Sequence, residues 1–163
     1  MQVWVLPTAW NIILDIAVWL LIQMGAAIFC NRLPLSFFEQ SRILTRIYPF
    51  ERNGRFYEQW LKVKAWKALL PDGSRLFTGG FAKKRLKGAS AVYLERFIME
   101  TRRGELAHWL AMFPLPVFLL WCDLPSFLIM CLYAAAANIP CIAAQRYNRI
   151  RLRRITEKGG NYL

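Results

Sequence analysis

Apolar residues gather in three blocks along the chain. The first, Trp10 to Cys30 (WNIILDIAVWLLIQMGAAIFC), has about the 20 residues that a membrane-spanning helix needs. No positively charged stretch precedes it and no small-residue cleavage site follows, so we do not interpret it as a signal peptide. The second block, Trp109 to Cys122, is short for a span unless Leu106 to His108 extend it, and the third runs from Leu124 to Ala144. The pattern predicts three transmembrane helices, over about residues 10–30, 106–122 and 124–144.

The segment between the first two blocks carries a helical pattern of its own. From Phe56 to Leu70 (FYEQWLKVKAWKALL) the apolar residues recur at steps of three and four, and the charged residues fall elsewhere. The sequence PDGS that follows is a turn signature. We predict an amphipathic helix with its tryptophans at the level of the lipid headgroups. It either covers other elements or, through Trp66, lines a substrate cleft.

The composition agrees with an integral membrane protein. Hydrophobic residues make up 56% of the 163 positions, which is too apolar for a small soluble domain, and the length predicts one domain over residues 1–163. The formal net charge is +12, and all 22 lysines and arginines lie in two segments, Arg32 to Arg103 and Arg146 to Lys158. The positive-inside rule makes both segments cytoplasmic, with the N-terminus outside and the C-terminus inside a bacterial cell membrane.

The predicted fold class is therefore an all-α integral membrane protein with about three transmembrane helices and cytoplasmic amphipathic helices at the interface. The interfacial segment is expected over residues 32–105 and a basic cytoplasmic tail over residues 145–163. Because neither a helix-turn-helix nor an interleaved aromatic and basic pattern is present in the sequence, the charge does not indicate nucleic acid. It favours a lipid bilayer with anionic headgroups as the partner.

Two further sequence features carry little chemistry. The basic run Lys83 to Lys87 (KKRLK) follows paired glycines without the spacing of a nucleotide-binding loop. We interpret it as a lipid-facing or solvated patch, and less often such a run forms a phosphate cradle. The four cysteines lie in or at the ends of the apolar blocks without paired spacing, so we expect packing residues and no metal site.

A dense polar sequence, ETRRGELAHW from Glu100 to Trp109, precedes the second apolar block and holds the only histidine. Histidine titrates near neutrality, so His108 can move protons. On a helix that begins after Ser90, a typical N-cap residue, Glu105 and His108 lie one turn apart on the same side. The carboxylate can then hold one imidazole nitrogen while the other faces a substrate hydroxyl. The pair could equally be a stabilising helix contact, and Glu100 needs a bend in the helix to take part.

The third apolar block also contains polar positions. Asn138 and Pro140 interrupt it, and they either free backbone groups for a ligand or mark a kink. Polar residues inside a span are costly and usually face protein or a cavity. By the same cost Asp15 in the first block is a functional candidate, although no role follows from the sequence. At the cytoplasmic end of the block comes a polar cluster that we expect at the depth of His108: Gln145, Arg146, Asn148 and Arg149.

With these motifs the chain resembles the glycosyl-4,4'-diaponeurosporenoate acyltransferases, small membrane enzymes that complete staphyloxanthin-type carotenoid biosynthesis in Gram-positive bacteria. The resemblance rests on ETRRGELAHW and NIPCIAAQRYNRIRL, with support from RLP at Arg32 and WKALLPDG at Trp66, and it covers most of the chain in the same order. It implies transfer of a fatty acyl group to a sugar hydroxyl of a glycosylated carotenoid or a related glycolipid. The implied donor is an acyl-CoA or acyl-carrier-protein thioester, with no other cofactor and possible association with other enzymes of the carotenoid pathway.

Acylation of a hydroxyl needs a base for the proton, donors for the thioester oxyanion, and a site open to both lipid and cytosol. We expect His108 to be the base and Glu105 to orient it, with Glu100 as the alternative partner. Arg103, Asn148 or Arg149 are expected to supply oxyanion or phosphate contacts. The complete set of expected substrate-binding residues is Arg102, Arg103, Asn138, Gln145, Arg146, Asn148, Arg149 and Trp66.

A second hypothesis comes from another class of protein. A non-enzymatic membrane adaptor could bind anionic lipid or a partner enzyme through a basic cytoplasmic face, and the charge and interfacial tryptophans fit it equally well. It does not explain polar residues at matched depth on two spans, or Asn138 inside one of them.

Overall fold

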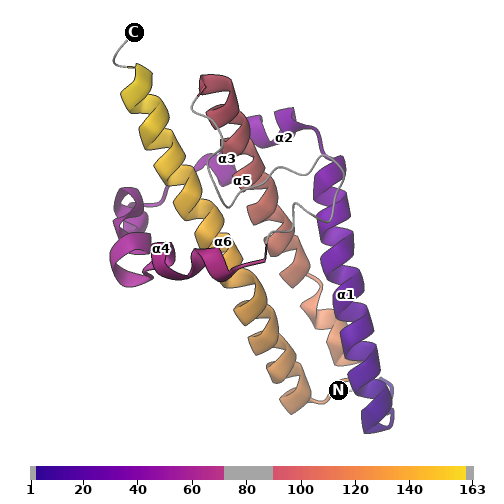
Figure 1. Ribbon diagram of the computed structural model, residues 1–163. Coiled ribbons are helices and arrows are strands. Elements are labelled where there is room, and N and C mark those ends of the chain that lie inside the picture. Colours follow the sequence, from indigo (N-terminus) through magenta and orange to yellow (C-terminus); the bar gives the residue numbers. More distant parts are fainter. Residues whose placement is uncertain (1–2, 72–89, 161–163) are drawn as a thin grey trace.

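Three long helices form the body of the protein in the computed structural model, which describes residues 3–71 and 90–160. They are α1 (Thr8–Arg32), α5 (Ala91–Met112) and α6 (Leu124–Gly160). Figure 1 shows the chain rising along α1, descending along α5 and rising again along α6, with its two ends at opposite ends of the bundle. The middle helix α5 contacts both of the others.

Shorter helices complete the described part of the chain, and all of its regular elements are helical, which confirms the all-α prediction. Most of them lie between α1 and α5, and one follows α5. They are α2 (Leu35–Gln40), α3 (Arg42–Thr45), the 3-10 helix η1 (Pro49–Gly54), the π-helix η2 (Phe56–Trp60), α4 (Val63–Trp66), and the 3-10 helices η3 (Lys67–Leu69) and η5 (Leu115–Leu120).

Two helices in the described residues, α1 and α6, are long and apolar enough to cross a membrane, with mean hydropathies of 2.2 and 2.0. Much of the apolar surface of α1 faces outward: Ile13, Leu20 and Leu21 are 56%, 61% and 72% exposed. Outward-facing leucine and isoleucine on a helix of this length suit contact with lipid tails. The two helices therefore agree with membrane association and with two of the three predicted spans.

The second apolar block is not one helix. α5 ends at Met112, and the 3-10 helix η5 follows from Leu115. Pro114 explains the break, because proline has no N–H for an intrahelical hydrogen bond and its ring clashes with the preceding turn. The charged first part of α5 and this break keep the block from forming a long apolar helix, so the predicted span over 106–122 is divided between two elements.

The predicted amphipathic helix over Phe56 to Leu70 is likewise divided, into η2, α4 and η3. The break falls at Lys62, which has a left-handed φ of 46° that an α-helix does not contain. The apolar face is partly as predicted: Val63 is buried and Trp66 packs beside it, whereas Trp60 is 76% exposed. Continuous periodicity therefore predicted the buried side of the segment better than its backbone.

Hydrophobic clusters hold the elements together, and a small one of Leu94, Phe97 and Leu152 joins α5 to α6. A second lies around Trp19 of α1, Phe118 of η5 and Ala134 of α6, and the amides of Val3 and Trp4 donate to Leu120 O at 2.8 and 2.9 Å beside it. A third attaches the short helices to α6, on the far side of α6 from α1 in Figure 1. Its buried members are Tyr57, Val63, Ala143, Ala144, Tyr147 and Ile150.

The interface of α5 and α6 sets the positions of the polar residues. The predicted N-cap is confirmed, since the Ser90 hydroxyl accepts a hydrogen bond from the Tyr93 amide at 3.3 Å. Helix α6 continues through Pro140 without interruption. At Gly104 the helices approach closely: a Cβ there would lie 3.1 Å from Gln145 Cδ. Close approach at this point allows α5 and α6 side chains to meet in the interior.

Candidate functional site

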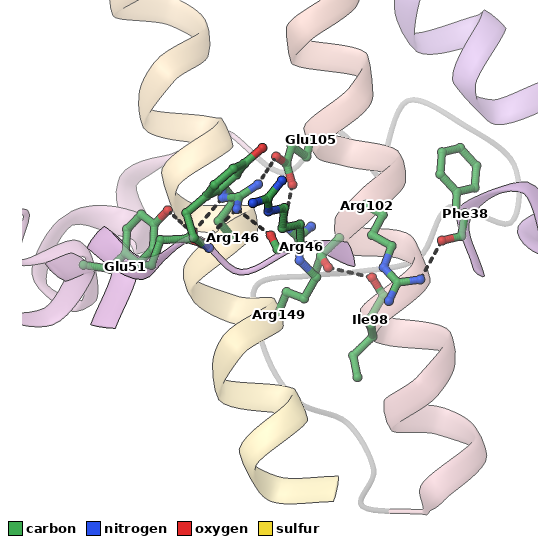
Figure 2. Close-up of polar contacts among 11 residues, drawn as sticks. Phe38, Arg46, Glu51, Ile98, Arg102, Glu105, Arg146 and Arg149 are labelled. Carbon is green, nitrogen blue, oxygen red and sulfur yellow. Dashed lines mark hydrogen bonds and ion pairs between the residues drawn. The ribbon is translucent and has the colours of Figure 1, made fainter. Parts of the chain in front are cut away.

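A buried network of two carboxylates and two guanidinium groups joins three parts of the chain. Arg146 of α6 binds Glu51 of η1 through Nε and Nη2, at 2.8 and 2.9 Å, and binds Glu105 of α5 through Nη1 at 2.7 Å. Arg149, one turn further along α6, places Nη2 2.6 Å from Glu105 Oε2. Figure 2 shows these groups converging between α5 and α6. The arrangement fixes η1 and both helices to one another.

The network is held inside the protein and not at its surface. The four residues are 0–9% exposed. Glu51 also accepts hydrogen bonds from the Tyr57 hydroxyl, at 2.7 Å, and from the Tyr48 amide, while Arg146 Nη2 donates to Arg46 O at 3.0 Å. Buried charges need such partners, because an unpaired one costs several kcal/mol.

Burial and hydrogen bonding act in opposite directions on Glu51. Burial by itself raises the pKa of the carboxyl, but hydrogen bonds from Arg146, Tyr57 and Tyr48 outweigh it and hold the pKa below the ordinary value of 4.5. For Tyr57, burial and then the adjacent Glu51 carboxylate both raise the pKa of the phenol. Glu51 is therefore ionised and Tyr57 protonated at neutral pH.

A pocket of about 470 Å³ lies against this network, and we call it the aromatic pocket. Its lining combines side chains of the segment before α4 with one face of α5 and one residue of α6. Phe50 and Trp109 are 57% and 49% exposed, whereas the charged residues at its inner side are buried. The lining residues are Leu44, Tyr48, Phe50, Tyr57, Glu105, Leu106, Trp109 and Arg146.

His108 belongs to a second polar cluster, within the apolar part of the bundle. Its Nδ1 lies 2.9 Å from Asn138 Oδ1, which also accepts a hydrogen bond of 3.4 Å from Gln23 Nε2. One residue from each long helix thus meets at this point. Asn138 is completely buried, which agrees with the expectation that this polar residue of α6 faces the interior near His108.

The amide of Asn138 determines which histidine nitrogen carries the proton. Asn138 Nδ2 donates to Ala134 O at 2.9 Å, so Oδ1 is the atom that faces the ring. An amide oxygen only accepts hydrogen bonds, and His108 Nδ1 must then be the donor. In the neutral imidazole the basic lone pair accordingly lies on Nε2, the nitrogen suited to accept a proton.

The two carboxylates expected to assist His108 have other partners. Glu105 binds Arg146 and Arg149, although it lies one turn from the histidine. Glu100 pairs with Arg103 at 2.7 Å. Two guanidinium groups on α6 attract the Glu105 carboxylate more strongly than a neutral ring does, and the side chain that contacts His108 in this conformation is Asn138.

Two arginines expected to bind substrate donate hydrogen bonds to the connection after α1. Arg102 Nη1 donates to Phe38 O at 2.6 Å, as Figure 2 shows, and to Glu39 O at 3.3 Å. Arg103 Nη2 donates to Leu33 O at 3.2 Å. These hydrogen bonds satisfy carbonyl groups around the short helix α2. Both side chains therefore help to hold this connection against α5.

The remaining candidates lie around α6. Asn148 accepts a hydrogen bond of 2.7 Å from Lys67 Nζ, and Trp66 Nε1 donates to Leu61 O at 2.7 Å. Gln145 lies against Gly104, and its Oε1 is buried without a hydrogen-bond partner among the described residues. Arg149 Nη1 is likewise buried without a hydrogen-bond partner among the described residues. Gln145 and Arg149 thus keep polar capacity that the described chain does not use.

Asp15 has a structural explanation. Its carboxylate accepts hydrogen bonds from Trp121 Nε1 at 2.8 Å and from Cys122 Sγ at 3.3 Å. The residue therefore ties α1 to the end of η5.

The basic run Lys83 to Lys87 lies outside the described residues. Within residues 3–71 and 90–160, no three His, Cys, Asp or Glu side chains are placed to hold a metal ion.

Sequence reasoning missed Glu51, Tyr57 and Gln23. Gln23 carried a usable signal, because it is a polar residue inside an apolar block, the same cost that drew attention to Asp15. Glu51 carried none: an acidic residue in a strongly basic segment is ordinarily solvated, and its partner Arg146 is 95 residues away in sequence.

Comparison with known proteins adds the family to this geometry. The profile of the family described as glycosyl-4,4'-diaponeurosporenoate acyltransferase matches residues 34–158. The chain belongs to this family. Curated proteins of that name from Staphylococcus aureus strains N315, USA300 and NCTC 8325 are each 35% identical to it over 134 residues, which is 82% of this chain and 81% of each relative. No solved structure matches.

Membership of an acyltransferase family selects between the two hypotheses drawn from the sequence, and it favours the enzyme over the adaptor. The matched range of the glycosyl-4,4'-diaponeurosporenoate acyltransferase family contains the ion-pair network, the aromatic pocket, His108 and Asn138. Asp15 and Gln23 of α1 precede it. The polar groups of η1, α5 and α6 therefore belong to the part of the chain that the family shares.

Proposed function

We propose that the protein transfers a fatty acyl group from a thioester donor to a sugar hydroxyl of a glycosylated carotenoid or a related glycolipid, with His108 as the general base. The glycosylated acceptor is the one that the names of the relatives imply. The donor is an acyl-CoA or an acyl-carrier protein, and the protein acts in the cell membrane, where it can associate with other enzymes of the same pathway.

The hydrogen bond between His108 and Asn138 carries the catalytic part of the proposal. The sugar hydroxyl gives its proton to His108 Nε2 as its oxygen attacks the thioester carbonyl carbon. The new C–O bond forms, the C–S bond breaks, and the departing thiolate takes the proton from the imidazolium. Asn138 supports this role because its Oδ1, 2.9 Å from Nδ1, keeps the other ring proton on Nδ1. No covalent acyl-enzyme is required.

The bundle provides a suitable setting for a lipophilic acceptor and a cytosolic donor. α1 and α6 are long enough to cross the bilayer, and the basic residues gather in the segments 32–103 and 146–158. With those segments in the cytoplasm, the N-terminus lies outside and the C-terminus inside. His108 then lies where α5 passes from its charged part to its apolar part, between the cytoplasmic basic segments and the membrane interior.

The direct test uses purified protein in nanodiscs with a glycosylated carotenoid acceptor. Acyl-CoA and acyl-carrier protein are supplied in separate reactions, and the product is followed by mass spectrometry as acceptor plus one acyl group. We expect product with at least one donor. If neither donor gives product while the related Staphylococcus aureus enzyme does under the same conditions, the proposed reaction is wrong.

A further inference from the structure

The aromatic pocket has no part in the roles proposed for His108 and Asn138. We infer that it holds the sugar ring of the acceptor, an inference that rests on the proposed function for the identity of the glycosylated ligand. The pocket lies between the segment of residues 44–57 and the neighbouring faces of α5 and α6, and its volume of about 470 Å³ is within the range of small-molecule sites.

The charges at the pocket favour a neutral ligand. Among its described lining residues one carboxylate, Glu105, faces one guanidinium, Arg146. The next groups in the network, Glu51 and Arg149, also balance. A phosphate or carboxylate would meet the Glu105 carboxylate and an Arg146 guanidinium that is already paired with two carboxylates, so an anion gains little from this network. One further cation, Arg46, lies over the Tyr48 ring at 5.4 Å. A ligand with hydroxyl groups adds no charge to a network that is already neutral.

Arg146 and Glu105, the two charged residues of the pocket lining, retain hydrogen-bonding capacity. Arg146 makes four hydrogen bonds within the described chain, to Glu51, Glu105 and Arg46 O. A guanidinium has five donors, and a carboxylate has about four acceptor positions. Sugar hydroxyls donate and accept at once, and they can use a remaining donor of Arg146 together with a remaining acceptor of Glu105. Because the ion pair between Arg146 and Glu105 holds both side chains in place, the remaining donor and acceptor keep a fixed position relative to each other.

The walls suit a sugar ring better than an acyl chain. Four of the lining residues are aromatic, and Phe50 and Trp109 are the most exposed of them. The C–H faces of a pyranose ring stack on aromatic rings, while its hydroxyls at the edge reach polar groups. A fatty chain entering this pocket would end against the ion pair, where an apolar terminus displaces water from charged groups without replacing its hydrogen bonds.

The position agrees with a sugar that is attached to a lipid. Trp109 lies where the polar sequence of α5 gives way to the apolar block, the interfacial depth at which tryptophan is common. A sugar bound beside it leaves its lipid portion free to remain in the bilayer. His108 is the neighbouring residue on α5, so the proposed base and this wall of the pocket belong to the same turn of one helix.

Binding can be tested separately from catalysis. A short alkyl glucoside below its micelle concentration is added to the nanodisc protein, and saturation transfer from protein to ligand is measured by NMR. We expect stronger saturation of the ring protons than of the alkyl protons. Trp109→Leu should reduce the ring signal several-fold, and Phe50→Leu provides a second variant at an exposed position. Trp60→Leu is the control, because Trp60 is exposed and lies outside the pocket. Absence of ring saturation in the parental protein would overturn the assignment.

Kinetics then separate this inference from the proposed function. Trp109→Leu should raise KM for the glycosylated acceptor about tenfold and leave KM for the thioester unchanged. A raised thioester KM with unchanged acceptor KM would mean that the pocket holds the acyl chain. If the parental protein binds the glucoside but acylates no acceptor, the reaction proposal fails, and the pocket remains a sugar-binding site whose ligand is not an acyl acceptor. If acyl transfer proceeds and both pocket variants behave as Trp60→Leu does, the pocket assignment alone fails.

Discussion

Arg146 and Glu51 are 95 residues apart in sequence, and their side chains form two hydrogen bonds of 2.8 and 2.9 Å inside the protein. A two-point contact of this kind fixes direction as well as distance, because the planar guanidinium matches both carboxylate oxygens. It makes η1 part of the same rigid unit as α5 and α6. The aromatic pocket is lined by residues of all three parts that this unit joins.

Breaking the network should destabilise the fold strongly. Arg146→Met leaves Glu51 and Glu105 buried without their shared cation, and we expect a loss of about 3–5 kcal/mol in the free energy of unfolding. Denaturant unfolding in detergent micelles measures this. Glu95→Gln, at an exposed position on the same helix as Glu105, serves as the control and should change stability by less than about 0.5 kcal/mol. Equal stability of the two variants would mean that the network contributes little.

The lowered pKa of Glu51 predicts a loss of stability in acid. A carboxyl whose folded pKa lies below its unfolded pKa stabilises the fold above the unfolded value, and this contribution disappears as pH falls through the folded value. We therefore expect the thermal midpoint to be constant near neutrality and to fall below pH 4.5, the ordinary value. In Glu51→Gln the midpoint at pH 7 should already be lower and its acid dependence shallower. An unchanged acid slope in the variant would assign the effect to other carboxyls.

Removal of the proposed base should abolish most of the catalysis without unfolding the protein. His108→Gln keeps a hydrogen-bonding side chain but has no basic nitrogen near neutral pH, and the rate should fall about 100-fold to 10,000-fold. Asn138→Leu should reduce the rate less, because the ring is retained while its tautomer is no longer imposed. Initial rates in nanodiscs, with circular dichroism to verify folding, provide the comparison. A His108→Gln enzyme as fast as its parent makes the histidine an interfacial bystander.

A backbone position offers an independent test of the short-helix segment. Gly54 has a φ of +92°, and a Cβ there would lie 3.2 Å from Ile150 Cγ2. Gly54→Ala should therefore cost about 1–2 kcal/mol of stability. Gly25 is the matched control, because a Cβ at this position of α1 meets nothing within 4 Å. Gly25→Ala should be neutral or slightly stabilising through helix propensity. Thermal unfolding of both variants in the same micelles gives the difference directly.

Membrane topology can be checked with accessible tags. An epitope at the N-terminus should be labelled on intact spheroplasts, and one at the C-terminus only after permeabilisation, because the basic segments are expected on the cytoplasmic side. In Figure 1 the start of α1 and the end of α6 lie at opposite ends of the bundle. External labelling of the C-terminus would remove the cytosolic route for the acyl donor.

Local sequence predicted what local chemistry controls. The first and third apolar blocks predicted α1 and α6, and Ser90 predicted the start of α5. The cost of burying an amide predicted that Asn138 faces the interior, where the structure places it. The interruption at Lys62 escaped prediction because hydrophobic periodicity contains no information about a single left-handed residue. Partner choice escaped it too: Glu105 has His108 one turn away, yet its carboxylate pairs with Arg146 and Arg149 on another helix, and such contacts depend on tertiary packing.

The polar contacts of α1 also constrain how the protein is made. Asp15 and Gln23 find partners 106 and 115 residues later in the chain, at Trp121 and Asn138. At synthesis rates of about 5–20 residues per second, α1 precedes these partners by roughly 5–20 seconds. During that interval a carboxyl and an amide wait at the translocon or in the bilayer without their final contacts. Because these two polar side chains are costly in lipid, we expect α1 to stay near the insertion machinery until Trp121 and Asn138 have been synthesised and can bind them.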